Sequence, residues 1–122
     1  MINISEHLDS NIVEMSISGY VTAQELDDTL AKLKTATERH GRFRLLEEIG
    51  ELDTPPIPWS KLWADVKFSF EHLSDVTHVA VVADQGWIAA YVNVLNPLMK
   101  AEIKQFKRAD LEIARTWLTQ AA

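Results

Sequence analysis

Residues 77–84, with the sequence THVAVVAD, form a short and nearly continuous run of β-branched and other apolar residues. A strand with one face open to water alternates apolar and polar residues, and this run does not. It therefore predicts a central strand that is covered on both faces, with Val79, Val81 and Val82 deeply buried. Such strands are typical of parallel sheets with helices on both sides, which limits how the rest of the chain can fold.

Two other β-type runs open the chain, INISEHL at residues 2–8 and NIVEMSISGYV at residues 11–21. Turn-forming residues at positions 9–11 separate them, so the two runs predict a β-hairpin. Along the second run apolar and polar side chains alternate, which predicts one buried face and one polar face. The apolar positions are Val13, Met15 and Ile17, and the polar positions are Glu14, Ser16 and Ser18.

The clearest helix signal is TAQELDDTLAKLKTATERHG, at residues 22–41. Thr22 is placed to cap this helix, Glu25 completes a capping box three residues later, and Gly41 supplies the C-terminal stop. The positions that share one face of the helix are Leu26, Leu30, Leu33 and Thr37.

The rest of the chain alternates strand and helix signals. Residues 42–49 (RFRLLEEI) predict a third strand, and the aromatic-rich segment after the prolines, from about Trp59, predicts a second helix. The segment GWIAAYVNVLN, at residues 86–96, predicts a third helix that ends near Pro97, because proline disfavours helical geometry in the residue before it.

The last two elements complete the predicted order. EIKQFK, at residues 102–107, is a short charged strand suited to a sheet edge, and DLEIARTWLTQ, at 110–120, is the last helix. The order β-β-α-β-α-β-α-β-α predicts an α/β fold with a mixed five-stranded sheet and right-handed crossovers. We expect a single domain that spans residues 1–122.

Charge and composition argue against several classes of function. The net charge is −6, whereas binding to nucleic acid or to an anionic membrane surface depends on cationic residues. Cysteine is absent, which excludes disulfides and four-cysteine zinc sites. The chain has no apolar stretch near the roughly 18 residues of a membrane span, and its start lacks a signal-peptide pattern. We therefore expect a cytoplasmic protein without stable membrane insertion.

The polar residues show no motif of a known chemistry. No two of the histidines (His7, His40, His72 and His78) have the i, i+4 spacing of a helical zinc site, and a metal shared by His72, Asp75 and His78 is the alternative to ordinary loop polarity. The chain also lacks a nucleophile elbow, a phosphate-binding loop and a dinucleotide fingerprint. We expect no metal, no cofactor and no catalytic residue. The acidic cluster LLEEIGELD is expected to be a solvated strand end and loop; its acids are Glu47, Glu48, Glu51 and Asp53.

Diffuse apolar and aromatic patterns over nearly the whole chain resemble the SpoIIAA-like family. They include FRLLEEIGEL leading into LWADVKFSFEHLSD, then VTHVAVVADQGW, and the ending AEIKQFKRADLEIARTWL. This family comprises small bacterial relatives of the STAS domain, the fold of anti-sigma-factor antagonists. The resemblance implies a SpoIIAA/STAS-like fold and a module that binds a partner protein or a hydrophobic ligand.

One position departs from the pattern of the STAS antagonists. Those proteins carry a phosphorylatable serine after an aspartate, at the start of the helix that follows the third strand. This chain reads ELDTPPIPWSKLW at that junction and has no Asp-Ser pair. Ser60 is the nearest hydroxyl at the helix start; we interpret it as an N-cap residue, with a phosphosite as the alternative.

The aromatic residues form two groups. In the second helix Trp63 and Phe70 share an apolar stripe that predicts core packing, and Trp59 stands at its first turn. Trp87 and Tyr91 lie one turn apart at the start of the third helix. Both helices begin at the carboxyl ends of parallel strands, where ligands of open α/β sheets bind. The alternative to a core is therefore an apolar cleft lined by Trp59, Trp63, Trp87 and Tyr91.

Phe68 lies opposite the core stripe of the second helix. It is either a solitary exposed side chain or part of a surface for a protein partner or a homodimer.

Three functional hypotheses follow. The first is a non-enzymatic binding or regulatory module for a protein partner or a small hydrophobic, lipid-like ligand. The second is an enzyme for a small apolar substrate in the same cleft, and the third is an antagonist that phosphorylation controls through Ser60.

Overall fold

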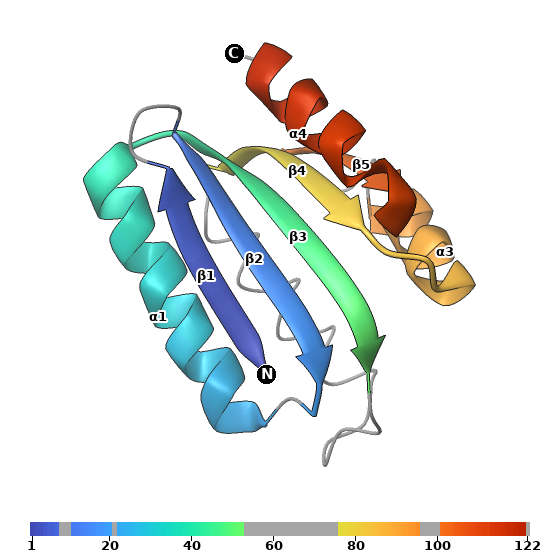
Figure 1. Cartoon of the computed structure of the whole chain (residues 1–122). Coiled ribbons are helices and arrows are strands. Elements are labelled where there is room, and N and C mark those ends of the chain that lie inside the picture. The colour runs from blue at the N-terminus through green and yellow to red at the C-terminus, as the bar shows by residue number, and fades with distance from the viewer. Residues whose placement is uncertain (8–10, 21, 53–75, 96–100, 122) are drawn as a thin grey trace.

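The computed structural model describes residues 1–7, 11–20, 22–52, 76–95 and 101–121 (Figure 1). The elements in chain order are β1 (Ile2–His7), β2 (Ile12–Gly19), α1 (Ala23–His40), β3 (Phe43–Leu52), β4 (Val76–Val82), α3 (Gly86–Leu95), β5 (Glu102–Phe106), a 3₁₀ turn (Arg108–Asp110) and α4 (Leu111–Gln120). The predicted second helix lies outside the described residues.

The five strands form one sheet in the order β1-β2-β3-β4-β5. β1 and β2 are antiparallel, and the pairs β2–β3, β3–β4 and β4–β5 are parallel. The predicted mixed five-stranded sheet is confirmed. β3 is its central strand, β4 is flanked on both sides, and the charged strand β5 lies at an edge as expected.

Helices of the described part lie on both faces of the sheet. Leu33 of α1 and Ile88 of α3 belong to one apolar cluster, which continues over the sheet through residues such as Val13 and Leu45. Leu118 of α4 belongs to a second cluster on the opposite face. The face that α1 and α3 cover is called the α1–α3 face below, and the other is called the α4 face.

The cap at Thr22 and the stop at Gly41 form as the sequence predicts, whereas the capping box does not, because the Glu25 carboxylate bonds to β1 and not back to Thr22. The backbone N–H of Glu25 donates a hydrogen bond of 3.0 Å to the hydroxyl of Thr22, which caps the helix. Gly41 has a φ of 70° directly after the helix, a conformation that glycine adopts without strain. The carboxylate of Glu25 accepts a hydrogen bond of 3.1 Å from the N–H of Ile2, so it ties the helix start to β1.

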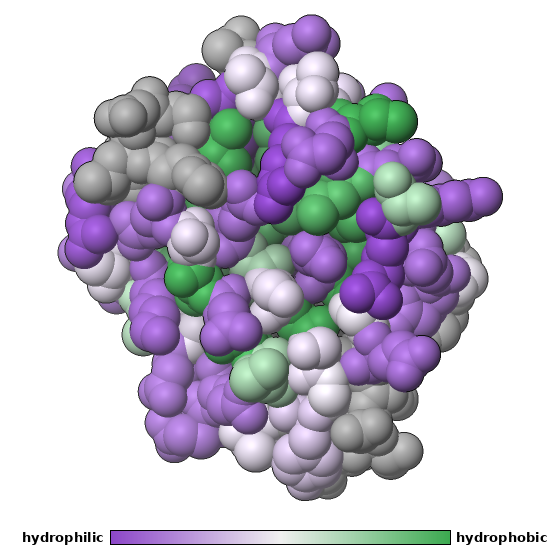
Figure 2. Space-filling model, viewed as in Figure 1, coloured by the Kyte–Doolittle hydropathy of each residue, from purple (hydrophilic) through white to green (hydrophobic). Residues whose placement is uncertain are grey.

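β2 has the predicted buried and polar faces. Val13 and Met15 are buried, whereas Ser16 is exposed. Figure 1 shows that α4 crosses the sheet over β3 and β4 and leaves the front of β1 and β2 without a helix. Figure 2, from the same side, shows mostly hydrophilic side chains with smaller hydrophobic areas among them. A partly uncovered sheet face is polar because its strands contact water there.

The burial predicted for β4 is confirmed, since Val79, Val81 and Val82 are 2%, 6% and 0% exposed. Replacing Val81 with alanine is expected to lower the free energy of unfolding by about 1–3 kcal/mol, through lost burial and a residual cavity. Urea denaturation measures this change. Ile113→Ala serves as the control, because that side chain is 59% exposed and its loss should change stability by less than about 0.5 kcal/mol. Equal losses for the two variants would contradict the buried position of Val81.

Candidate binding site

Glu47 lies in the middle of the sheet, on the central strand β3. Its backbone is in register with Met15 of β2 and Val81 of β4. Leu45 and Ile49, two residues before and after it on the strand, belong to the apolar cluster of the α1–α3 face. Because side chains alternate along a strand, the carboxyl group of Glu47 lies on that same apolar face. The side chain is 6% exposed.

The carboxyl group of Glu47 has an unusual environment. Among the described residues, no hydrogen bond or ion pair is made to it. Burial raises its pKa from 4.5 to about 7, because removal from water disfavours the charged form. Burial of a carboxyl group costs folding energy, and titratable groups with such shifted pKa values are concentrated at functional sites. Glu47 is therefore the leading site residue of the described part of the chain.

The expectation of a solvated acidic cluster is wrong for Glu47. Its neighbour Glu48 lies on the α4 face, where its carboxylate is 3.9 Å from the guanidinium of Arg108, and Glu51 is exposed. Strand alternation separates two adjacent acids onto opposite faces of the sheet. The spacing of Leu45, Glu47 and Ile49 could have indicated that Glu47 lies on the apolar face. Leu46, however, is equally apolar, so the sequence is equally consistent with Glu48 lying on the apolar face.

A buried polar atom without a described hydrogen-bond partner lies at the carboxyl edge of the parallel strands. Gln85 follows β4 and precedes α3, and its amide nitrogen donates a hydrogen bond of 2.7 Å to the carbonyl of Gly50 at the end of β3. Its carbonyl oxygen is buried and lacks a hydrogen-bond partner in the described structure. This edge is where ligands of open α/β sheets bind, and it is where the sequence places the aromatic cleft.

The structure leaves the predicted aromatic residues untested. Trp59, Ser60, Trp63 and Phe68 lie in the segment 53–75, outside the described residues, and so does the predicted core residue Phe70. Trp87 and Tyr91 belong to α3, but their side chains are not among those described. The aromatic cleft, the phosphosite and the partner surface therefore remain predictions.

The α4 face carries a hollow of about 490 Å³ beside α4. It is lined by Asn3, Ile4, Ser5, Glu14, Met15, Ser16, Leu46, Glu48 and Arg115. The guanidinium of Arg115 contacts the carboxylate of Glu14 at 2.9 Å and also pairs with Glu112. The arginine is thus held by acids of β2 and of its own helix. The charge of Arg115 in this hollow is thus already compensated by carboxylates of the protein itself. Such an arrangement is typical of a sheet face in contact with water.

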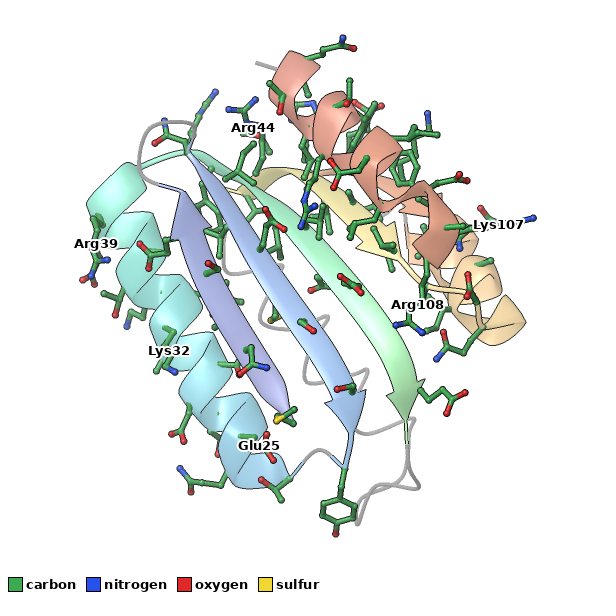
Figure 3. The ribbon with its side chains drawn as sticks, viewed as in Figure 1. Glu25, Lys32, Arg39, Arg44, Lys107 and Arg108 are labelled. Carbon is green, nitrogen blue, oxygen red and sulfur yellow. The ribbon has the colours of Figure 1, made fainter. Side chains whose placement is uncertain are left out.

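Charged residues at the two ends of α4 are also paired (Figure 3). Arg44 lies near the C-terminal end of the helix and donates a hydrogen bond of 2.6 Å to the carbonyl of Leu118. This contact favours the helix, because a cation lies at the negative end of its dipole. Arg108 lies near the helix start.

His78, one member of the alternative metal site, contacts an aromatic ring and a carboxylate on the α4 face. Its ring lies edge-on to the ring of Trp117, with the ring centres 5.7 Å apart, and its Nε2 is 3.5 Å from the carboxylate of Glu102. His72 and Asp75, the other members of the alternative metal site, lie outside the described residues. Within the described part of the chain, no group of three His, Asp or Glu residues is arranged to hold a metal.

The fold and the site together define a small α/β domain with a buried carboxyl group on its central strand. The model of the SpoIIAA-like family matches residues 12–119, and the chain belongs to this family. The resemblance inferred from the sequence is thereby confirmed. No helix in the described ranges is both long enough and apolar enough to cross a membrane.

A solved structure shows the same fold. It is an uncharacterised protein of the DUF3478 family with a SpoIIAA-like fold from Shewanella loihica PV-4, with a TM-score of 0.70 and 24% identity. The alignment covers 97% of this chain and 92% of that one. A comparison with curated proteins finds no match.

Proposed function

We propose that this protein is a non-enzymatic binding module that takes a small, mostly apolar ligand on the α1–α3 face, with Glu47 as the polar contact. The observation that carries the proposal is the position of the Glu47 carboxyl group, which is buried on an apolar face of the central strand. A ligand with one polar group would pair with this carboxyl, and the site would be lined by the register partners of Glu47, Met15 and Val81. Ligand sites commonly combine an apolar lining with a few placed polar groups.

The family supports a binding role in general terms. The resemblance to the STAS-type fold implies modules that bind partner proteins or hydrophobic ligands. Between these, the buried position of Glu47 favours a small ligand, since a partner protein would contact exposed side chains. A regulatory protein partner remains the alternative, with Phe68 as the residue that the sequence predicts for its contact.

An enzyme for a small apolar substrate is the second candidate. A carboxyl group with a pKa of about 7 can both accept and donate a proton at neutral pH, as a general acid or base must. Binding without turnover separates the two functions: the module returns its ligand unchanged, whereas an enzyme consumes it.

Titration with n-octanol, followed by NMR of the ¹⁵N-labelled protein, tests the proposed site. We expect saturable shifts at Met15, Glu47 and Val81, because the ligand lies on the α1–α3 face. Glu47→Leu removes the polar contact and should weaken octanol binding roughly two- to tenfold, the effect of one hydrogen bond. Glu48→Leu alters the opposite face and should leave the affinity unchanged. Unsaturable shifts, or shifts centred on the α4 face at Ser5 and Ser16, would contradict the proposal.

A further inference from the structure

We propose that the hollow on the α4 face is a second binding site, and that it takes a neutral, polyhydroxylated molecule such as a sugar. This site lies on the opposite face of the sheet from Glu47, so it goes beyond the proposed function and does not depend on it. The hollow has a volume of about 490 Å³ and lies beside α4, over the front of β1 and β2 that Figure 1 shows without a helix. Small-molecule sites have volumes of roughly 300–1,000 Å³, so a small ligand fits this hollow.

The polar groups of the hollow come from three neighbouring strands that hold them in fixed register. Asn3 of β1 is paired with Ser16 of β2, and Ser16 is paired with Glu48 of β3. In the adjoining row, Ser5 of β1 is paired with Glu14 of β2. These five side chains lie on the α4 face, because they alternate along their strands with residues of the opposite apolar cluster. Neighbouring strands are about 5 Å apart, so an amide, two hydroxyls and two carboxylates recur at short, regular intervals.

The hydrogen-bonding capacity of these groups favours a ligand with hydroxyl groups. The amide of Asn3 and the hydroxyls of Ser5 and Ser16 both donate and accept hydrogen bonds, whereas an ionised carboxylate such as that of Glu48 only accepts them. A ligand hydroxyl can pair with all of these groups, because it also donates and accepts. An ammonium group only donates, and a carboxylate ligand only accepts. Asn3, Ser5 and Ser16 are exposed, so a ligand reaches them by displacing water, and its own hydroxyls replace the hydrogen bonds of that water.

The charged groups in the described lining favour a ligand without a net charge. The guanidinium of Arg115 donates hydrogen bonds of 3.2 Å from Nε and 2.9 Å from Nη2 to the carboxylate of Glu14, and another to Glu112. The carboxylate of Glu48 is 3.9 Å from the guanidinium of Arg108. Each of these charges therefore has an opposite charge of the protein beside it. A charged ligand would compete with these pairs, whereas a neutral ligand leaves them intact.

The contact between Arg115 and Glu14 also fixes the shape of the hollow. It joins α4 to β2 along one side of the hollow, and the strands hold the remaining polar groups in register. A site whose groups are already in place loses little conformational freedom when a ligand binds.

NMR titration of the ¹⁵N-labelled protein with D-glucose, D-glucosamine and D-glucuronate tests this site, because the three probes share one ring type and differ in charge. At about pH 6.5 glucosamine is a cation and glucuronate is an anion. We expect glucose to cause saturable shifts at Asn3, Ser5, Ser16 and Glu48, and we expect neither charged probe to bind more tightly than glucose. Ser16→Ala and Asn3→Ala should each weaken glucose binding by about two- to tenfold, the effect of one lost hydrogen bond.

Thr35→Val is the matched control, because it removes a hydroxyl from an exposed residue of α1 that does not line the hollow. It should leave the glucose affinity within about twofold of wild type, since distant sites act independently. Shifts that stay proportional to the glucose concentration, or equal losses in all three variants, would overturn the inference. Tighter binding of glucosamine would show that the acids of the hollow attract a cation, and tighter binding of glucuronate would show that Arg115 attracts an anion. Either of these two results would also overturn it.

Discussion

Replacing Glu47 with glutamine should stabilise the protein at pH 8 by about 3 kcal/mol more than at pH 4. Burial raises the pKa of this carboxyl from 4.5 in the unfolded chain to about 7 in the folded protein. Below about pH 4.5 both states are protonated, and the carboxyl adds no pH-dependent cost. Between the two values the unfolded chain loses its proton first, so the free energy of unfolding falls as the pH rises. Above about pH 7 the loss levels off near 3 kcal/mol, since each pKa unit corresponds to about 1.4 kcal/mol.

Urea denaturation of the wild type and of Glu47→Gln at pH 4, 6, 7 and 8 measures this effect. The difference between the two proteins isolates Glu47, because the other titrating groups are common to both. Glu48→Gln controls for the loss of one negative charge from the same strand. A difference between wild type and Glu47→Gln that stays constant over this pH range would show that Glu47 is not buried in an apolar environment.

Replacing Phe43 with alanine should lower the free energy of unfolding by about 3–5 kcal/mol, more than any other substitution proposed for this protein. Phe43 begins β3, is 1% exposed and belongs to the same apolar cluster as Leu45 and Ile49. Removing its ring takes away buried apolar surface and leaves a cavity that the rigid neighbouring strands fill only in part. The loss should exceed that of Val81→Ala, because a phenyl ring is larger than the two methyl groups of valine.

The midpoint and slope of urea unfolding, followed by circular dichroism, report the effect of Phe43→Ala. Tyr20→Ala is the control, because Tyr20 is also aromatic but 49% exposed, and its loss should change stability by less than about 0.5 kcal/mol. Phe43→Leu keeps much of the apolar volume and should fall between the two. A loss below about 1 kcal/mol for Phe43→Ala would contradict the close packing of this end of β3.

The sequence predicted most of the described fold because its signals are local. The run at 77–84 has no polar alternation, so it had to be flanked by strands and covered on both faces, as β4 is. Thr22 and Gly41 mark the ends of α1 through backbone geometry that depends only on nearby residues. The charges of β5 likewise predicted its position at the edge.

The candidate site could not be predicted in the same way. The expected aromatic cleft depends on side chains outside those described, so it remains a prediction. The burial of Glu47 was not predicted, because β3 carries apolar residues on both faces, Leu45 on one and Leu46 on the other. A period of two then cannot tell which of the adjacent acids, Glu47 or Glu48, points into the core.

The sequence by itself therefore determined the described elements, their order and the mixed sheet, because hydrophobic periodicity, caps and turns act over a few residues. Only the tertiary structure decided which acid is buried. Met15 and Val81, the register partners of Glu47, come from strands that are distant in the sequence and meet only in the sheet. The solvation of a carboxyl group, and hence its pKa, depends on everything packed around it in space. For this reason Glu47, the leading site residue among those described, was found from the fold and not from the sequence pattern.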